Sequence, residues 1–105
     1  MAAVTGDEVL ELVVARIREV LGVGADAAVL ARAGAASWRD VRFDEDLHAD
    51  SLDLVEIVEG TERELRRRGV PVEVGDADLA GVRAVGDAVD ALVGRSAGPA
   101  PVPPA

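Results

Sequence analysis

Hydrophobic residues near the start of the chain recur at intervals of three and four positions. The apolar residues that follow this spacing are Val9, Val13, Ile17, Val20 and Leu21. Because such a spacing places side chains on one face of a helix, it predicts an amphipathic helix with one buried side. Thr5 or Asp7 is expected to cap its start, and Gly22 and Gly24 to end it.

The same spacing returns after residue 50 and predicts a second long helix. Its inward residues are Leu54, Ile57, Val58, Thr61 and Leu65. Asp50 is a strong N-cap candidate, and Asp53 follows three residues later, as in a capping box. Arg66–Arg68 lie at the end of this helix, where the helix dipole favours positive charge. Gly69 then closes the helix, and Pro71 prevents its continuation.

The last quarter of the chain predicts one short helix and one single turn. The apolar residues of the short helix are Val85, Val89 and Leu92. It is expected to end at Gly94, and Asp76 or Asp78 could cap the single turn that runs through Leu79. No segment shows the alternation typical of a β-strand. The chain is therefore predicted to be all-α, a small four-helix bundle of three main helices and one short helix.

Between the first two main helices the hydrophobic pattern is weaker, and a long loop is expected. A short helix could form over residues 26–33, but Gly34 would stop it. The stretch "SWRDVRFDEDLHAD" (residues 37–50) is expected to be an ordered loop. Its apolar anchors to the core would be Trp38, Val41, Phe43 and Leu47.

Residues 1–94 are predicted to form one small domain, and residues 95–105 a disordered tail rich in Pro and Ala. The segment "MAAVTGDEVLELVV" lacks the basic and apolar regions of a secretory signal. No apolar run reaches membrane-spanning length, so no membrane contact is expected. We therefore expect a cytoplasmic protein, and a monomer.

Charge and composition narrow the function. The chain has 20 acidic and 11 basic residues, all of the latter arginine, and a formal net charge of −9. Nucleic acid is not expected as a partner, because binding phosphates needs a basic surface. Basic protein surfaces are favoured instead. The absence of cysteine excludes a thiol nucleophile, and with a single histidine no metal site is expected.

Ser51 stands at the start of the second long helix, in "HADSLDLVEI", and four interpretations compete. From composition alone, a simple helix-start residue is favoured. A nucleophile with His48 as its base lacks the surrounding "GxSxG" elbow. A calcium loop in "DEDLHAD" fails in both registers, because unsuitable residues fall at required positions. The fourth interpretation is a modified serine, since a phosphodiester there would meet free backbone N–H groups.

One family resemblance bears on this choice. The stretch "DEDLHADSLDLVEIVEGTERELRRRGVPV" resembles the attachment region of acyl carrier proteins, with its Asp-Ser-Leu at the start of a helix. The stretch "DADLAGVRAVGDAVDAL" is similar to the family's third and fourth helices. The resemblance covers roughly residues 7–93 and implies the same four-helix fold.

The resemblance implies that Ser51, flanked by Asp50 and Leu52, receives 4′-phosphopantetheine from coenzyme A. The thiol of this arm would carry acyl groups as thioesters, so the chain would tether intermediates and not be an enzyme itself. The expected docking residues are Asp53, Val55, Glu56, Glu59 and Glu62, together with Leu52. The expected partners are a phosphopantetheinyl transferase and acyltransferases, ketosynthases or other acyl-processing enzymes with basic patches.

Several positions depart from the family pattern. The segment before Ser51 is longer than usual, and the Arg66–Arg68 run replaces some of the usual acids. His48 stands where relatives often have Gly, and Glu59 where many have an apolar residue. Thr61, which follows Gly60, stands at an inward position often filled by a larger aliphatic residue, so the interior could be roomier or the helix locally frayed. These departures and the Pro-rich tail favour polyketide or other specialised metabolism. The alternatives are primary fatty acid synthesis and an unmodified docking domain that uses its acidic helix.

Overall fold

The computed structural model describes residues 4–24 and 26–96 and contains five α-helices and one 3-10 helix. In chain order these are α1 (Gly6–Leu21), α2 (Asp26–Ala33), η1 (Trp38–Asp40), α3 (Ser51–Arg67), α4 (Asp76–Ala80) and α5 (Val85–Ser96). No strand occurs in these residues, and one isolated antiparallel bridge pairs Arg42 with Ala84. The prediction of a small all-α bundle is confirmed.

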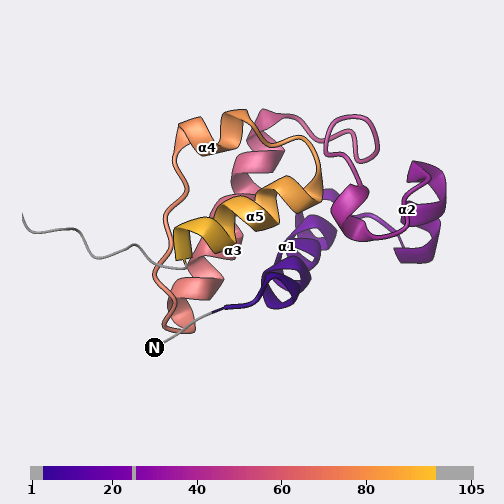
Figure 1. Cartoon of the computed structure of the whole chain (residues 1–105). Helices are drawn as coiled ribbons and strands as arrows, with labels where there is room; N and C mark the ends of the chain where they lie inside the picture. Colours follow the sequence, from indigo (N-terminus) through magenta and orange to yellow (C-terminus); the bar gives the residue numbers. More distant parts are fainter. Residues whose placement is uncertain (1–3, 25, 97–105) are drawn as a thin grey trace, which may run out of the picture.

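The bundle is formed by α1, α3 and α5, which pack against one another (Figure 1). The short α4 connects α3 to α5, and η1 packs on α5 and α1. The fully buried residues of the three main helices include Val9, Val13, Ile17, Ile57, Leu65, Val85, Val89 and Leu92. They belong to the three stripes predicted from the spacing, and burying these aliphatic side chains supplies most of the driving force for packing.

The start of α1 shows how the sequence fixes a helix end. Of the two candidate caps, Thr5 takes the N-cap position. Its Oγ1 accepts a hydrogen bond from the Glu8 N–H at 3.2 Å, while Glu8 Oε1 accepts one from the Thr5 N–H at 3.0 Å. The hydrogen bond from the Thr5 backbone lowers the pKa of Glu8. At the other end, Gly22 adopts the left-handed conformation (φ +64°) that glycine tolerates best.

The segment between α1 and α3 is more ordered than a long loop. It contains α2 at the residues where a short helix was considered possible, and then η1. Figure 1 shows α2 standing to one side of the three main helices. Val29 is its buried residue, and Asp26 forms an ion pair with Arg18 of α1. The four predicted loop anchors are all buried: Trp38, Val41, Phe43 and Leu47.

The middle of α3 is continuous, so Gly60 does not fray the helix. The side chain of Arg16 from α1 fills the space beside it, and a Cβ atom at position 60 would lie 2.8 Å from Arg16 Cδ. Thr61 is fully buried, and its hydroxyl donates to the Ile57 carbonyl at 2.9 Å. The space beside Gly60 is therefore taken by an arginine side chain.

The last helix is longer than expected. It continues through Arg95 to Ser96, whose hydroxyl donates to the Val93 carbonyl at 3.1 Å, so the predicted boundary at Gly94 is two residues too early. The rest of the predicted tail, residues 97–105, lies outside the described residues. Among the helices of the described chain, none combines the length and the apolar character needed to cross a membrane.

Candidate functional site

The start of α3 is closed by the predicted capping box. Asp50 Oδ1 accepts a hydrogen bond from the Asp53 N–H at 2.8 Å, and Asp53 Oδ2 accepts one from the Asp50 N–H at 3.1 Å. The Asp50 carbonyl accepts the first bond of the helix from the Leu54 N–H at 3.0 Å. Both carboxylates are therefore used to fix this helix end, which is where Ser51 begins the first turn.

The capping box leaves part of this helix end unsatisfied. The first four N–H groups of a helix have no acceptor within the helix. Here the box satisfies those of Asp50 and Asp53, and within the described residues the N–H groups of Ser51 and Leu52 have no acceptor. Ser51 is itself exposed, and its hydroxyl makes no hydrogen bond to another described residue. An anion joined to Ser51 would thus meet two free donors and the positive end of the helix dipole.

The residue after Ser51 is the most exposed large hydrophobic of the described chain. Leu52 has a relative exposure of 72%, and no other large apolar side chain of the described residues is comparably open. A single exposed leucine is ordinary on protein surfaces. Its position beside an exposed serine hydroxyl is what makes it a candidate for contact with another protein.

The loop before Ser51 is held to the segment before α5. The Phe43 N–H donates to the Arg83 carbonyl at 3.0 Å, and the Val85 N–H donates to the Val41 carbonyl at 2.8 Å. Within the loop, the Ala49 N–H donates to the Phe43 carbonyl at 2.8 Å. These bonds place the stretch around Arg83 next to the serine, although 32 positions separate the two in the numbering.

His48 adopts a left-handed backbone conformation, with φ +55°. This region is uncommon for residues other than glycine. The side chain is exposed, and no hydrogen bond among the described residues joins it to Ser51. The arrangement of serine, base and orienting carboxylate that a hydrolase needs is therefore not formed by these residues.

A small cavity of about 130 Å³ opens beside Ser51. Its lining combines apolar, acidic and basic side chains: Phe43, Ala49, Leu54, Val82, Asp44, Asp50, Ser51 and Arg83. No motif or helical spacing in the sequence connects Arg83 with Ser51, so Arg83 is not among the predicted site residues. Only the backbone hydrogen bonds between the two segments bring it into this wall.

The expected docking residues of α3 differ in their exposure. Glu56 and Glu59 are exposed, Val55 is partly buried, and Asp53 is partly buried and engaged in the capping box. The expectation for Glu62 was wrong. This carboxylate is only 6% exposed, and its Oε2 accepts a hydrogen bond from the Val74 N–H at 2.6 Å.

The arginine run at the end of α3 is paired within the chain. Glu64 accepts hydrogen bonds from Arg67 at 2.7 Å and from Arg68 at 2.9 Å, and the bond from Arg68 is the main cause that lowers the pKa of Glu64. Arg66 Nη2 donates to the Val72 carbonyl at 3.1 Å and lies 3.6 Å from Glu62 Oε1. This run therefore has an internal explanation, and it no longer points to particular partners.

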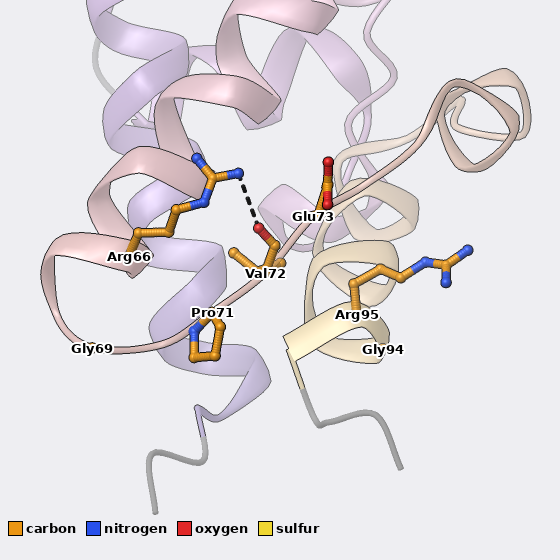
Figure 2. A pocket seen from close by; sticks show the side chains of 7 residues that line it. All are labelled: Arg66, Gly69, Pro71, Val72, Glu73, Gly94 and Arg95. Atoms are coloured by element: carbon orange, nitrogen blue, oxygen red, sulfur yellow. Dashed lines mark hydrogen bonds between the residues drawn. The ribbon is translucent and has the colours of Figure 1, made fainter. Parts of the chain in front are cut away.

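A larger hollow than the cavity beside Ser51 lies far from this residue. It is an open groove of about 770 Å³ between the end of α3, the following extended segment and the end of α5, lined by Arg66, Gly69, Pro71, Val72, Glu73, Gly94 and Arg95. Figure 2 shows Arg66 turned toward the Val72 carbonyl and Arg95 extending away from it. Arg95 instead binds Asp78 through two hydrogen bonds of 3.0 Å. Fifteen helical residues separate Ser51 from Arg66, about 22 Å along α3.

Two further findings concern metal ligands in this structure and the comparison with known protein families. Within residues 4–24 and 26–96, no group of three or more metal-ligating side chains is arranged to hold a metal ion. The chain matches no model of a known protein family.

Proposed function

We propose that the chain is an acyl carrier protein that holds acyl intermediates on a 4′-phosphopantetheine arm at Ser51. The observation that carries the proposal is the surface at the start of α3, where an exposed serine hydroxyl stands beside two free N–H groups and the exposed Leu52. The sequence resemblance around Asp50, Ser51 and Leu52 supports the same assignment.

The residues present fit this group. A phosphodiester on Ser51 would lie at the positive end of α3, where the free N–H groups of Ser51 and Leu52 can donate to its oxygens. The cavity beside Ser51 offers the apolar side chains of Phe43, Leu54 and Val82 next to the attachment point. When bound, the group supplies a terminal thiol that holds acyl chains as thioesters.

In the loading reaction Ser51 Oγ attacks the phosphorus of coenzyme A that bears the pantetheine. A new O–P bond forms at Ser51, and the pyrophosphate bond of coenzyme A breaks. Adenosine 3′,5′-bisphosphate leaves, and the hydroxyl proton passes to the transferase. The capping box supports this step, because it fixes the backbone on both sides of Ser51 without engaging the Ser51 hydroxyl.

The partner surface follows from the exposed residues of α3. Leu52, Glu56 and Glu59 lie at positions i, i+4 and i+7 and therefore share one face of the helix. A leucine with two carboxylates suits a partner that offers an apolar contact within a basic patch. Because such contacts are mainly electrostatic, their association weakens as the salt concentration rises.

We also propose specialised metabolism, such as polyketide synthesis, in preference to primary fatty acid synthesis. The support that remains for this choice is the inserted α2 segment, because the Arg66–Arg68 run is engaged with Glu62 and Glu64. A carrier whose connection between α1 and α3 differs from a standard bundle suits partners that recognise the difference.

The test is the mass of the intact protein after incubation with coenzyme A, Mg²⁺ and a phosphopantetheinyl transferase of broad specificity. The wild type is expected to gain one phosphopantetheine, and Ser51→Ala none. Ser37→Ala is the matched control, because Ser37 is also exposed and also precedes a helical turn, and it is expected to load like the wild type. A folded wild type that stays at its starting mass would contradict the proposal and favour an unmodified docking domain.

A further inference from the structure

Arg83 shares the wall of the small cavity with Ser51. The two residues come from different parts of the chain, the segment before α5 and the first turn of α3. Both residues line the same space of about 130 Å³, so an arginine side chain starts beside the serine. It is the cation of that cavity, whose other charged lining residues are Asp44 and Asp50.

The backbone at Arg83 is fixed by three hydrogen bonds. Its carbonyl accepts the Phe43 N–H at 3.0 Å. Asp87 Oδ2 accepts the N–H groups of both Arg83 and Ala84 at 3.0 Å, and these backbone bonds lower the pKa of Asp87. The Cα atom of Arg83 is thus held against the loop that leads into Ser51, so that its side chain starts from a defined place.

The side chain of Arg83 is not engaged by a carboxylate of the described chain. Of the eleven arginines, eight form ion pairs within the described residues, and the remaining three are Arg32, Arg63 and Arg83. Asp87 is the acid nearest in the chain. Its carboxylate accepts hydrogen bonds from the backbone N–H groups, and the charge of Arg83 helps to lower its pKa, but the two side chains form no ion pair among the described residues. Arg83 therefore remains available for another anion.

An anion attached to Ser51 would be stabilised by a positive charge such as that of Arg83. Asp44 and Asp50 line the cavity, and Asp53 lies in the same turn of α3. Adding a phosphodiester places a further negative charge among these carboxylates, and like charges within several ångströms repel one another. A guanidinium in the same wall offsets this repulsion, and its planar donors match the oxygens of a phosphate.

We propose that Arg83 is a positioning residue that holds the phosphodiester formed on Ser51. The inference rests on the proposed carrier function and adds a residue from another segment that lines the same cavity. Through this contact the pantetheine arm would leave the protein in a restricted direction, toward the face between α3 and the segment before α5.

The experiment is a thermodynamic cycle on the whole chain. The midpoint of thermal unfolding is measured by circular dichroism for the unmodified and the fully loaded forms of the wild type, Arg83→Ala and Arg83→Lys. Complete loading is verified by intact mass. Arg63→Ala is the matched control, because Arg63 is another exposed arginine without an ion pair to described residues and does not line the cavity.

Loading is expected to lower the unfolding midpoint of Arg83→Ala more than that of the wild type, by roughly 2–5 °C, the range for one exposed charge pair in a small domain. Arg83→Lys is expected to restore part of this difference. Arg63→Ala is expected to respond to loading as the wild type does. In 1 M NaCl the difference should largely vanish, because salt screens exposed charges.

Two results would overturn the inference. One is an equal effect of loading on the wild type, Arg83→Ala and Arg63→Ala. The other is a folded Arg83→Ala that cannot be loaded, since Arg83 would then serve the transferase. Failure of the carrier function looks different, because the wild type itself would then gain no mass.

Discussion

Glu62 Oε2 accepts a hydrogen bond from the Val74 N–H at 2.6 Å, and this contact ties the second half of α3 to the segment that leads into α4. Arg66, one turn further along α3, donates to the Val72 carbonyl of the same segment. Residues 70–75 are thus bound to α3 by one carboxylate and one guanidinium, in addition to the Val70 N–H, which donates to the Leu65 carbonyl at 2.8 Å. After Val70 the two charged side chains supply the partners for backbone groups of this segment.

Replacing Glu62 tests this contact. Glu62→Ala should lower the free energy of unfolding by about 1–3 kcal/mol, because it leaves a partly buried N–H group without an acceptor. Glu62→Gln keeps an acceptor oxygen and should lose less. Urea denaturation followed by circular dichroism measures both. Glu59→Ala is the control on the exposed side of α3, and an equal effect of the two alanine variants would contradict the role given to Glu62.

Two glycines of α5 should respond in opposite directions to alanine. A Cβ atom at Gly86 would lie 3.0 Å from the Arg39 carbonyl oxygen, whereas one at Gly94 would meet nothing within 4 Å. Gly86→Ala should therefore cost about 1 kcal/mol or more, because η1 must move away from α5. Gly94→Ala should gain up to about 1 kcal/mol from helix propensity. Thermal unfolding measures the stability of the two variants. Equal unfolding midpoints would contradict the close packing of α5 on η1.

Asp87 should make stability depend on acidic pH. Hydrogen bonds from the Ala84 and Arg83 backbones hold its folded pKa below its usual value of 3.8. The unfolded state therefore binds the proton more readily, so this carboxylate stabilises the fold above the unfolded pKa, and the contribution is lost as the pH falls through the folded pKa.

The measurement for Asp87 compares the wild type with Asp87→Asn between pH 7 and pH 3. The wild type should be more stable at pH 7, by about 1 kcal/mol as for other capping residues, and the difference should shrink below a pH of about 4. Glu11→Gln is the control, because Glu11 is exposed in the middle of α1 and its side chain makes no hydrogen bond to a described residue. A difference that stays constant over the whole pH range would refute the assignment.

Leu52 should matter for recognition and not for folding. Its side chain is 72% exposed, so Leu52→Ala should change the free energy of unfolding by less than about 0.5 kcal/mol. If the transferase covers this side chain, its KM for the variant should rise about tenfold, as expected for losing the burial of one leucine. Steady-state loading kinetics measure this, and an unchanged KM would remove Leu52 from the proposed contact.

The helices and their ends could be predicted because they depend on local sequence. The spacing of Val9, Val13 and Ile17 defines the buried face of α1, and Asp50 with Asp53 defines the start of α3. Such signals involve residues within one or two turns of one another, and the structure follows them closely.

The contacts between distant segments could not be predicted in the same way. Glu62 lies beside the buried stripe of α3, between Val58 and Leu65, but only the return of the chain at Val74 decides that it is covered. Arg83 likewise reaches the wall beside Ser51 through backbone bonds made by Phe43 and Val85. The spacing of residues along a helix predicts neither the contact of Glu62 with Val74 nor the place of Arg83 beside Ser51, because both depend on how loops fold back on the bundle.

The α2 segment, which stands to one side of the bundle, has a consequence for how this fold can change. The connection between α1 and α3 spans about 30 residues, and the closure entropy of a flexible loop grows only with the logarithm of its length, so removing the eight residues of α2 would alter that cost by only about 0.3 kcal/mol. Loop closure therefore sets little limit on the length of this segment, and what ties α2 to the bundle is the burial of Val29. Variation concentrated there would let one bundle acquire new partners while the chemistry at Ser51 stays untouched.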